Sequence, residues 1–283
     1  MASDRVVVYG LSTEGYSIAC QMAINGANVF IIDESSQSAI SLKAEIAKTY
    51  PNVSALKEDE PLLAMEPIDV AISKSQYLFF APRIRKTGQE TKTEVHSKFK
   101  DATASLKKGS SVVYTLPTGI GGNSENISLL EHVTGLEVGK SISYFYYPLG
   151  GGNQPPKVIG SYNNKQDPAL AGLLTNSKKE ISFVGISSAE HFHAINVLSR
   201  FSSLCSVLEV CKFAQDDNTK TDLQSDDFQN IFLDDMVNGL YDLRSLGTSF
   251  EGANTLMYLI NGSLKGIDGY IKRLIDRSEE PHV

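Results

Sequence analysis

The chain has 283 residues, 41% of them hydrophobic, and a formal net charge of −7 at pH 7. This length supports one large domain or two of moderate size, and the composition suits a soluble globular protein with a full core. The negative charge argues against a nucleic-acid partner, whose phosphates require a basic surface. We also expect no membrane partner, because no apolar run approaches the roughly 20 residues of a membrane span, and no secretory leader, because no basic-then-apolar segment opens the sequence.

The first 33 residues have the order of a dinucleotide-binding unit. A β-branched run at residues 6–8 leads into a turn with small residues at Gly10, Ser12 and Gly15, and a helical apolar pattern, a second apolar run and Asp33 follow. In this order, backbone N–H groups at the start of the helix face a pyrophosphate, and Asp33 accepts hydrogen bonds from an adenosine ribose. The pattern predicts nucleotide binding. The alternative is a βαβ unit whose glycines serve only tight packing.

The cofactor prediction is NAD, with NADP as the alternative, because the carboxylate of Asp33 repels a 2′-phosphate. Ser12 stands where the usual fingerprint has its second glycine, and its Cβ is expected to crowd the pyrophosphate and reduce affinity. The residues predicted to contact the cofactor are Gly10, Leu11, Ser12, Thr13, Glu14, Gly15, Asp33, Ala81, Pro82, Arg83 and Thr115.

Two later strands are predicted to end near the same place. Residues 76–82 form a buried apolar run stopped by a proline, and Arg83, Arg85 and Lys86 follow at once. Ligands bind beyond the carboxyl ends of parallel strands, so these cations are placed for a phosphate; a solvated basic loop is the alternative. Residues 111–115 form the next strand, and the glycine-rich turn after it lies where a nicotinamide would arrive.

The rest of the chain alternates between helical and extended patterns. We predict helices at residues 35–49, 92–107 and 126–133, a loop with at most one short helix at 52–65, and strands at 141–147, 157–160 and 181–185. A long helix over residues 188–215 has an apolar stripe that includes Phe192 and Ile195, and helices at 228–246 and 253–276 follow. The sequence therefore predicts an α/β fold: a Rossmann-type, doubly wound, mostly parallel sheet in residues 1–187, then an all-α domain in residues 188–283 that the long helix opens.

Several of these motifs together resemble the UDP-glucose/GDP-mannose dehydrogenase family, within the 6-phosphogluconate dehydrogenase-like superfamily. The likeness to its N-terminal and central domains is carried by residues 10–15, Asp33, 106–113, 129–139, 155–160 and 189–190. The family's nucleophilic cysteine, in a Gly-Gly-His-Cys loop, has no counterpart in this sequence, and the positions of its catalytic lysine and asparagine hold His193 and Val197. Oxidation of a sugar alcohol to an acid needs that cysteine, so the resemblance implies a diverged relative and not a working UDP-glucose dehydrogenase.

No metal site is expected. The three cysteines, Cys20, Cys205 and Cys211, lack metal-ligand spacing and are predicted to be free thiols in a reducing cytoplasm. The turn at residues 115–118 is also similar to the one after the iron-ligating cysteine of the methanogen iron hydrogenase, but Tyr114 and Thr115 stand in place of that cysteine.

The start of the long helix carries the candidate catalytic residues. His193 is the candidate acid–base group, because it matches the family lysine and imidazole exchanges protons near neutral pH; Asn196 is placed to orient a substrate oxygen. A structural role at a domain interface is the alternative for both, and Glu190 is expected to be a first-turn anion of this helix.

Two functions therefore stay open. One is an NAD(P)-dependent oxidoreductase acting on a small or phosphorylated hydroxy or carbonyl substrate. The other is a non-catalytic NAD(P)-binding sensor or partner protein. The C-terminal helices predict a homodimer.

Overall fold

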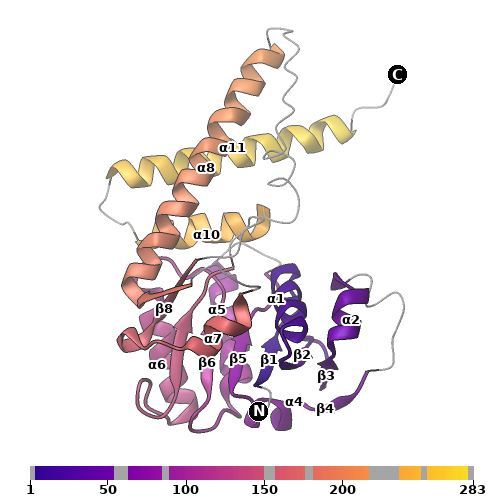
Figure 1. The fold of residues 1–283 in the computed structure, drawn as a ribbon. Helices are drawn as coiled ribbons and strands as arrows, with labels where there is room; N and C mark the ends of the chain where they lie inside the picture. The colour runs from indigo at the N-terminus through magenta and orange to yellow at the C-terminus, as the bar shows by residue number, and fades with distance from the viewer. Residues whose placement is uncertain are drawn as a thin grey trace.

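The computed structural model describes residues 4–53, 63–84, 89–149, 157–175, 181–216, 236–249 and 254–279. Within these residues, a nine-stranded sheet of order β4-β3-β2-β1-β5-β6-β7-β8-β9 forms the core of the lower part of the molecule in Figure 1. Its strands are β1 (Arg5–Tyr9), β2 (Asn28–Ile32), β3 (Ser38–Leu42), β4 (Met65–Pro67), β5 (Tyr77–Phe80), β6 (Ser111–Tyr114), β7 (Ser143–Tyr146), β8 (Val158–Ser161) and β9 (Ser182–Gly185). The five neighbouring strands β2, β1, β5, β6 and β7 are parallel to one another. The strands that flank them, β3 and β8, run antiparallel to them. The mostly parallel sheet confirms the predicted fold class.

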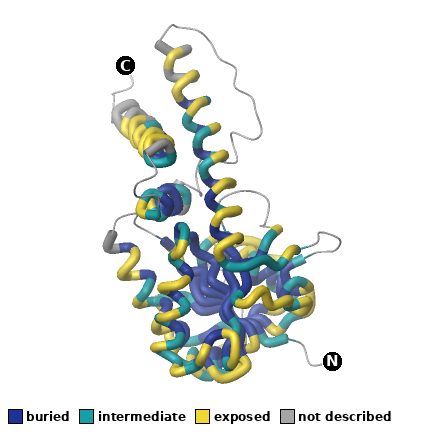
Figure 2. Tube along the Cα trace, turned by 90° about the vertical axis from the view of Figure 1, so that its left-hand side faces the viewer, coloured by how far each residue is buried: buried dark blue, intermediate teal, exposed yellow. Residues whose placement is uncertain are grey.

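Helices cover both faces of this sheet, as its alternating side chains require. In β1, Val6 and Val8 face one apolar cluster, while Val7 and Tyr9 face the other. The first cluster is closed by α1 (Thr13–Ile24), α2 (Ala44–Thr49) and α7 (Pro168–Leu174), and the second by α4 (Ile68–Ser73), α5 (Gln89–Thr103) and α6 (Gly122–Thr134). Figure 2 shows the strands as the most deeply buried part of the chain. Burial on both faces explains why these strands read as continuous apolar runs.

Three further helices pack on one another beyond the sheet. They are the long α8 (Ile186–Asp216), α10 (Met236–Ser249) and α11 (Asn254–Glu279), and α8 rises from the sheet to cross α11 (Figure 1). Their shared core is a third apolar cluster to which α8 contributes Ala194, Val197, Phe201, Leu204 and Leu208. The approach of α8 and α10 is close, because a Cβ on Gly239 would lie 2.1 Å from the Phe201 ring.

The apolar stripe predicted for the long helix is wrong at two positions. Phe192 is 53% exposed and Ile195 is 65% exposed, whereas Ala194 and Val197 are buried. The buried face of α8 is therefore rotated by about one residue from the predicted stripe near its start. The side chain of Cys211 lies outside the described residues.

The helix predicted at residues 35–49 is also wrong in its first half. The Ser36 N–H donates to the Asp33 carbonyl at 2.9 Å, and the Ser36 hydroxyl donates to the Ser38 carbonyl at 3.0 Å. These bonds close a turn that sends residues 38–42 back along β2 as the antiparallel strand β3, and only α2 is helical. These local hydrogen bonds, one of them made by a side chain, stabilise the turn in place of a helix at residues 35–42. The strand β4 and the helix α4 were not predicted.

The remaining predicted elements lie close to their expected places, with end shifts of a few residues. Parts of the loop at 52–65, the start of the helix at 228–246, and Arg85 and Lys86 lie outside the described residues. Among the described helices, none has a stretch both long and apolar enough to cross a membrane.

Candidate functional site

The glycine turn after β1 brings the first helix close to the end of β5. Gly10 has φ +95°, and a Cβ there would lie 2.3 Å from the Pro82 Cα. A Cβ on Gly15 would lie 2.7 Å from the Cβ of Ala81. Both positions thus need glycine for close packing. This is the role that the glycines have in the alternative interpretation of the sequence, a βαβ unit whose glycines serve only tight packing. The turn also leaves the N-terminus of α1 at the carboxyl edge of the parallel strands, where a nucleotide phosphate binds in folds of this type.

Ser12 caps the helix that follows this turn. It is the N-cap residue of α1, and its hydroxyl oxygen accepts the Gly15 N–H at 3.0 Å. The bond satisfies one of the unpaired N–H groups at the start of the helix. The serine therefore occupies a backbone donor at the start of the helix, an effect beyond the steric crowding expected from the sequence.

Arg83 connects the end of β5 to the glycine turn. Its guanidinium donates to the Leu11 carbonyl at 2.9 Å, and its own backbone N–H donates to the Glu34 carboxylate at 2.6 Å. Asp33, the predicted ribose ligand, accepts the Ser35 N–H at 3.2 Å and its hydroxyl at 3.0 Å. A cation, Arg83, and a carboxylate, Glu34, from two segments thus meet beside the turn, and a second carboxylate, Asp33, is the preceding residue in the chain.

Three predicted cofactor contacts are buried and take part in packing or hydrogen bonds within the fold. Ala81 and Pro82 are buried against the glycine turn, as described above. Thr115 is 1% exposed, and its hydroxyl donates to the Phe80 carbonyl at 2.7 Å. That donation leaves only the lone pairs of the Thr115 hydroxyl for a ligand.

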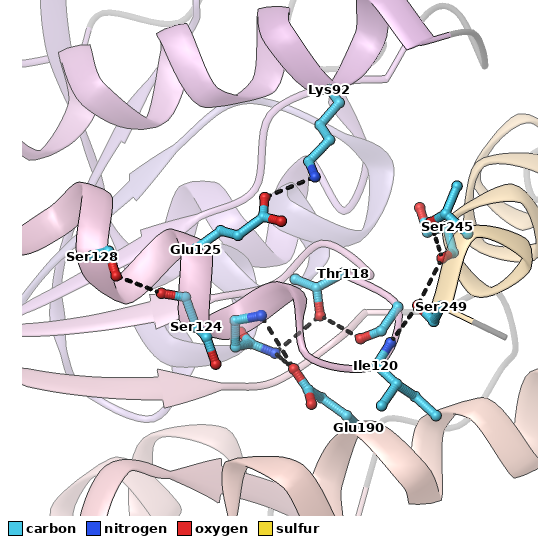
Figure 3. Close-up of polar contacts among 12 residues, drawn as sticks. Lys92, Thr118, Ile120, Ser124, Glu125, Ser128, Glu190, Ser245 and Ser249 are labelled. Carbon is cyan, nitrogen blue, oxygen red and sulfur yellow. Dashed lines mark hydrogen bonds and ion pairs between the residues drawn. The ribbon is translucent and has the colours of Figure 1, made fainter. Parts of the chain in front are cut away.

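A second polar cluster lies at the carboxyl ends of β6 and β7, centred on Glu190 (Figure 3). Glu190 is 3% exposed, and one carboxylate oxygen accepts the Gly121 N–H at 2.9 Å. The other oxygen accepts the Asn123 N–H at 3.1 Å and the Asn123 side-chain amide at 2.8 Å. Glu190 is thus not a first-turn anion of α8, in which it is the fifth residue. It instead caps the N-terminus of α6, where the helix dipole favours a negative charge.

The Asn123 amide extends this cluster toward β7. Its nitrogen donates to the Thr118 hydroxyl at 2.9 Å, and its oxygen accepts the Tyr144 hydroxyl at 2.7 Å. The helix α10 closes over the same loop, because the Ile120 N–H donates to the Ser249 hydroxyl at 2.9 Å. The loop after β6 is therefore held from the sheet, from α8 and from α10.

His193 forms a buried pair with Asp242 of α10. Its Nε2 lies 2.6 Å from Asp242 Oδ2, and the two side chains are 11% and 4% exposed. A carboxylate at Nε2 favours the tautomer with the proton on that nitrogen, which leaves Nδ1 as the basic nitrogen. This arrangement of an imidazole oriented by a carboxylate is the one that acid–base catalysis uses.

Tyr146, the last residue of β7, lies against this pair. Its ring meets the His193 ring edge to face, with centroids 6.4 Å apart. Burial, and next the charge of Asp242, raise the pKa of the Tyr146 phenol, while nearby Thr118 opposes the rise. The Thr118 contact lacks the geometry of a regular hydrogen bond, and neither the Tyr146 hydroxyl nor Asp242 Oδ1 has one to any described residue. A buried donor and a buried acceptor thus lie in the neighbourhood of His193.

Other residues predicted for this region face elsewhere. Asn196 is exposed, and His191, also exposed, lies with its Nδ1 2.7 Å from the Ser187 carbonyl. The structure thus brings His193 into a polar centre and leaves Asn196 on the outer surface of α8.

Sequence reasoning missed Asp242 and Tyr146. Asp242 had one signal, since it interrupts an apolar run as a lone acid between Tyr241 and Leu243. Tyr146 had no distinguishing signal inside an aromatic strand. Among the described residues, no group of three or more His, Cys, Asp or Glu side chains is arranged to hold a metal ion.

The two polar regions share one edge of the sheet. The glycine turn follows β1, the Thr118 loop follows β6, and Tyr146 ends β7; these strands are parallel and are linked through β5. Adjacent strands lie about 4.8 Å apart, so the ends of β1 and β7 are separated by roughly 14 Å. In open α/β sheets ligands bind beyond this edge, at the carboxyl ends of the parallel strands.

No protein-family model matches the chain, and no curated protein matches it in sequence. Solved structures share its fold. A UDP-glucose dehydrogenase from Pyrobaculum islandicum gives a TM-score of 0.61 at 14% identity, covering 96% of this chain and 69% of that one. A 3-hydroxyisobutyrate dehydrogenase from Salmonella typhimurium gives 0.58 at 12% identity, covering 93% and 92%.

An NDP-N-acetyl-D-galactosaminuronic acid dehydrogenase from Methanosarcina mazei gives a TM-score of 0.52 at 14% identity, with 75% of this chain covered. The match covers 50% of that protein, so this chain spans about half its length. At such identities the likeness is one of fold. The chain thus has a Rossmann-type fold that resembles the fold of UDP-glucose dehydrogenase and related nucleotide-sugar dehydrogenases.

Proposed function

We propose that this protein is an NAD(P)-binding oxidoreductase that transfers hydride on a small or phosphorylated hydroxy or carbonyl substrate. The observation that carries the proposal is the buried His193–Asp242 pair beside Tyr146, on the same sheet edge as the glycine turn. In this proposal residues 1–187 form the nucleotide-binding domain, and residues 188–283 form a helical domain that supplies the acid–base group. The dehydrogenase fold of the solved structures supports a nicotinamide cofactor.

The cofactor's place is the turn from Gly10 to Gly15. The close-packed glycines bring the backbone to the edge of the sheet, the N-terminus of α1 favours a negative charge, and Arg83 adds a cation. NAD is the proposed form because Asp33 stands at the ribose end. When bound, the nicotinamide accepts or returns the hydride.

The protein's own side chains then have to accept or return the substrate's proton. In the oxidative direction, His193 would take the proton of the substrate's O–H bond as the hydride leaves the carbon that bears it, so that a carbonyl forms. Asp242 stabilises the resulting imidazolium and holds its orientation. In the reductive direction the same pair returns the proton. Asn196 is exposed, so its proposed role in orienting a substrate oxygen lacks support from its position.

A non-catalytic nucleotide sensor is the second candidate, and one observation favours it. The Ser12 hydroxyl occupies the Gly15 N–H, which weakens the phosphate site in a way that a slow or regulatory binder tolerates.

Titration with NADH and NADPH tests the shared premise of both candidates. The sequence contains no tryptophan, so the emission of the bound reduced cofactor is followed without that background. Binding should raise the emission and the melting temperature. Absence of both effects would refute nucleotide binding.

A screen of hydroxy and carbonyl compounds with His193→Ala then separates the two candidates. We expect turnover to fall by at least 100-fold, in the range of general acid–base catalysis. His191→Ala is the matched control, because this exposed histidine lies two residues away, and it should leave turnover unchanged. Equal turnover of wild type and His193→Ala would exclude the acid–base role.

We also propose a homodimer formed through the C-terminal helices. Large apolar side chains are exposed along α8 and α11: Phe192, Ile195, Val210, Phe213, Tyr258 and Leu259. Burial of such a surface against a second copy removes apolar area from water. Light scattering after gel filtration should give twice the mass of the chain, and an Ile195→Asp, Phe213→Asp variant should give the monomer mass. A wild-type monomer at micromolar concentration would contradict this proposal.

We also propose a cytoplasmic location, which the unbridged thiols of Cys20 and Cys205 support.

A further inference from the structure

We propose that a small cavity beside Lys165 is a second ligand site, which binds a compact oxyanion: a phosphate or carboxylate group. The cavity has a volume of about 140 Å³, and its lining residues include Gly139, Ser143, Tyr162, Asn163 and Lys165. A cavity of about this size holds a molecule as large as benzene. The inference goes beyond the proposed nucleotide binding and does not depend on it.

The cavity lies at the edge of the sheet where the parallel strands begin, away from the proposed catalytic residues. Ser143 is the first residue of β7, whereas Tyr146, beside His193, is the last. Three steps along a strand cover about 10 Å. Because β8 runs antiparallel to β7, it brings the short helix η1 (Tyr162–Asn164) and Lys165 to the start of β7. A ligand in this cavity therefore does not compete with one at the opposite edge.

The polar side chains that line the cavity are hydrogen-bond donors. Lys165 Nζ donates to Ser143 Oγ at 2.7 Å. The ammonium keeps two further hydrogens, and the Ser143 hydroxyl, which accepts in this bond, keeps its own hydrogen for a ligand. The Asn163 amide adds a third donor group. Phosphate and carboxylate oxygens accept hydrogen bonds, and they form their strongest bonds with charged donors such as lysine.

The backbone places the Asn163 amide and the Tyr162 ring against Gly139. Asn163 and Asn164 have φ values of +57° and +53°, the left-handed conformation that asparagine tolerates better than most residues. A Cβ on Gly139 would lie 2.9 Å from Asn163 Nδ2 and from two carbons of the Tyr162 ring. The glycine thus makes room for both side chains, and an unfavourable backbone conformation of this kind is common at ligand sites.

The charges around the cavity also suit an anion. Lys165 donates to the neutral Ser143 hydroxyl, so this bond leaves its charge uncompensated. The acids nearest in the chain, Glu131, Glu137 and Asp167, are each bonded to other groups. Lys165 is exposed, and water and salt therefore screen its charge. We accordingly expect a dissociation constant in the millimolar range.

Isothermal titration with inorganic phosphate and with acetate tests the site, and Asn163→Asp is the decisive variant. Aspartate has nearly the same size and also tolerates the left-handed backbone, but it replaces a donor with a negative charge. Affinity should fall at least tenfold, since a charge-assisted hydrogen bond is lost and a repulsion is gained. Asn164→Asp is the matched control, because the adjacent residue has almost the same φ but does not line the cavity. It should weaken binding by less than about threefold.

Lys165→Ala provides an independent variant and should also weaken binding about tenfold. Lys48→Ala, which removes the same charge from an exposed lysine of α2, should leave the affinity unchanged. Melting temperatures show whether each variant is folded. Binding of phosphate alone would assign a phosphorylated ligand, and binding of acetate a carboxylate; either result supports the site.

Three results would overturn the assignment. The first is that neither anion binds wild type at up to roughly 10 mM, ten times a 1 mM dissociation constant. The second is equal weakening by Asn163→Asp and Asn164→Asp. The third is displacement of the anion by saturating NADH, which would place it at the glycine turn. If NADH itself fails to bind, the proposed function fails, while the anion titrations still decide the fate of this site.

Discussion

Replacing Glu190 with alanine should destabilise the protein by about 3 kcal/mol. The carboxylate accepts three hydrogen bonds from Gly121 and Asn123 at 2.8–3.1 Å and is 3% exposed. Hydrogen bonds to a charged group contribute about 1.5–3 kcal/mol each, and the burial cost that the variant no longer bears offsets part of their sum. The loss also leaves the first N–H groups of α6 unpaired.

Chemical denaturation followed by circular dichroism measures this loss. In a thermal scan, a loss of 3 kcal/mol corresponds to a fall of roughly 6–9 °C in Tm for a chain of this size. Glu137→Ala is the control, because Glu137 is 57% exposed in its ion pair with Lys140 and should cost less than about 0.5 kcal/mol. A Glu190→Ala variant no less stable than Glu137→Ala would refute the capping role.

Three further changes test the glycine turn and the buried tyrosine. Gly10→Ala should lower the free energy of unfolding by more than about 3 kcal/mol or prevent folding. Gly26→Ala is the control, because Gly26 has φ +91° but a Cβ there meets no atom within 4 Å, and it should cost only about 1–2 kcal/mol. Equal losses of stability in denaturation would show that the clash with Pro82 is relieved. Ser12→Gly should lower Tm slightly and tighten NADH binding by about tenfold, because a charge-assisted hydrogen bond becomes available; an unchanged Kd would mean that the freed N–H is not used. Burial raises the native pKa of Tyr146 above its unfolded value near 10. Its contribution to stability is therefore full below pH 10 and falls above it by up to about 1.4 kcal/mol per pH unit. The urea midpoint of wild type should fall relative to that of Tyr146→Phe as pH rises from 10 to 11.5, and parallel curves would contradict the shift.

The parallel core of the fold was predictable because its determinants are local. Residues 6–8 and 29–32 are apolar on both sides of the strand, which is typical of a sheet covered on two faces, and Gly10 marks the turn by its need for positive φ. The error at residues 35–49 has a local cause as well. The Ser36 hydroxyl forms hydrogen bonds with the backbone N–H and carbonyl of Ser38, which compete with a helix, and the apolar periodicity of a sequence does not account for such bonds.

By itself, the sequence determined the strand–turn–helix order, the acid after β2 and the long helix that carries His193. Only the tertiary structure decided which groups meet. His193 and Asp242 are 49 residues apart, and Glu190 caps a helix that begins nearly 70 residues before it. Such pairs depend on how α8 and α10 dock on the edge of the sheet. Docking is set by the fit of whole apolar faces, which no short segment of the sequence records.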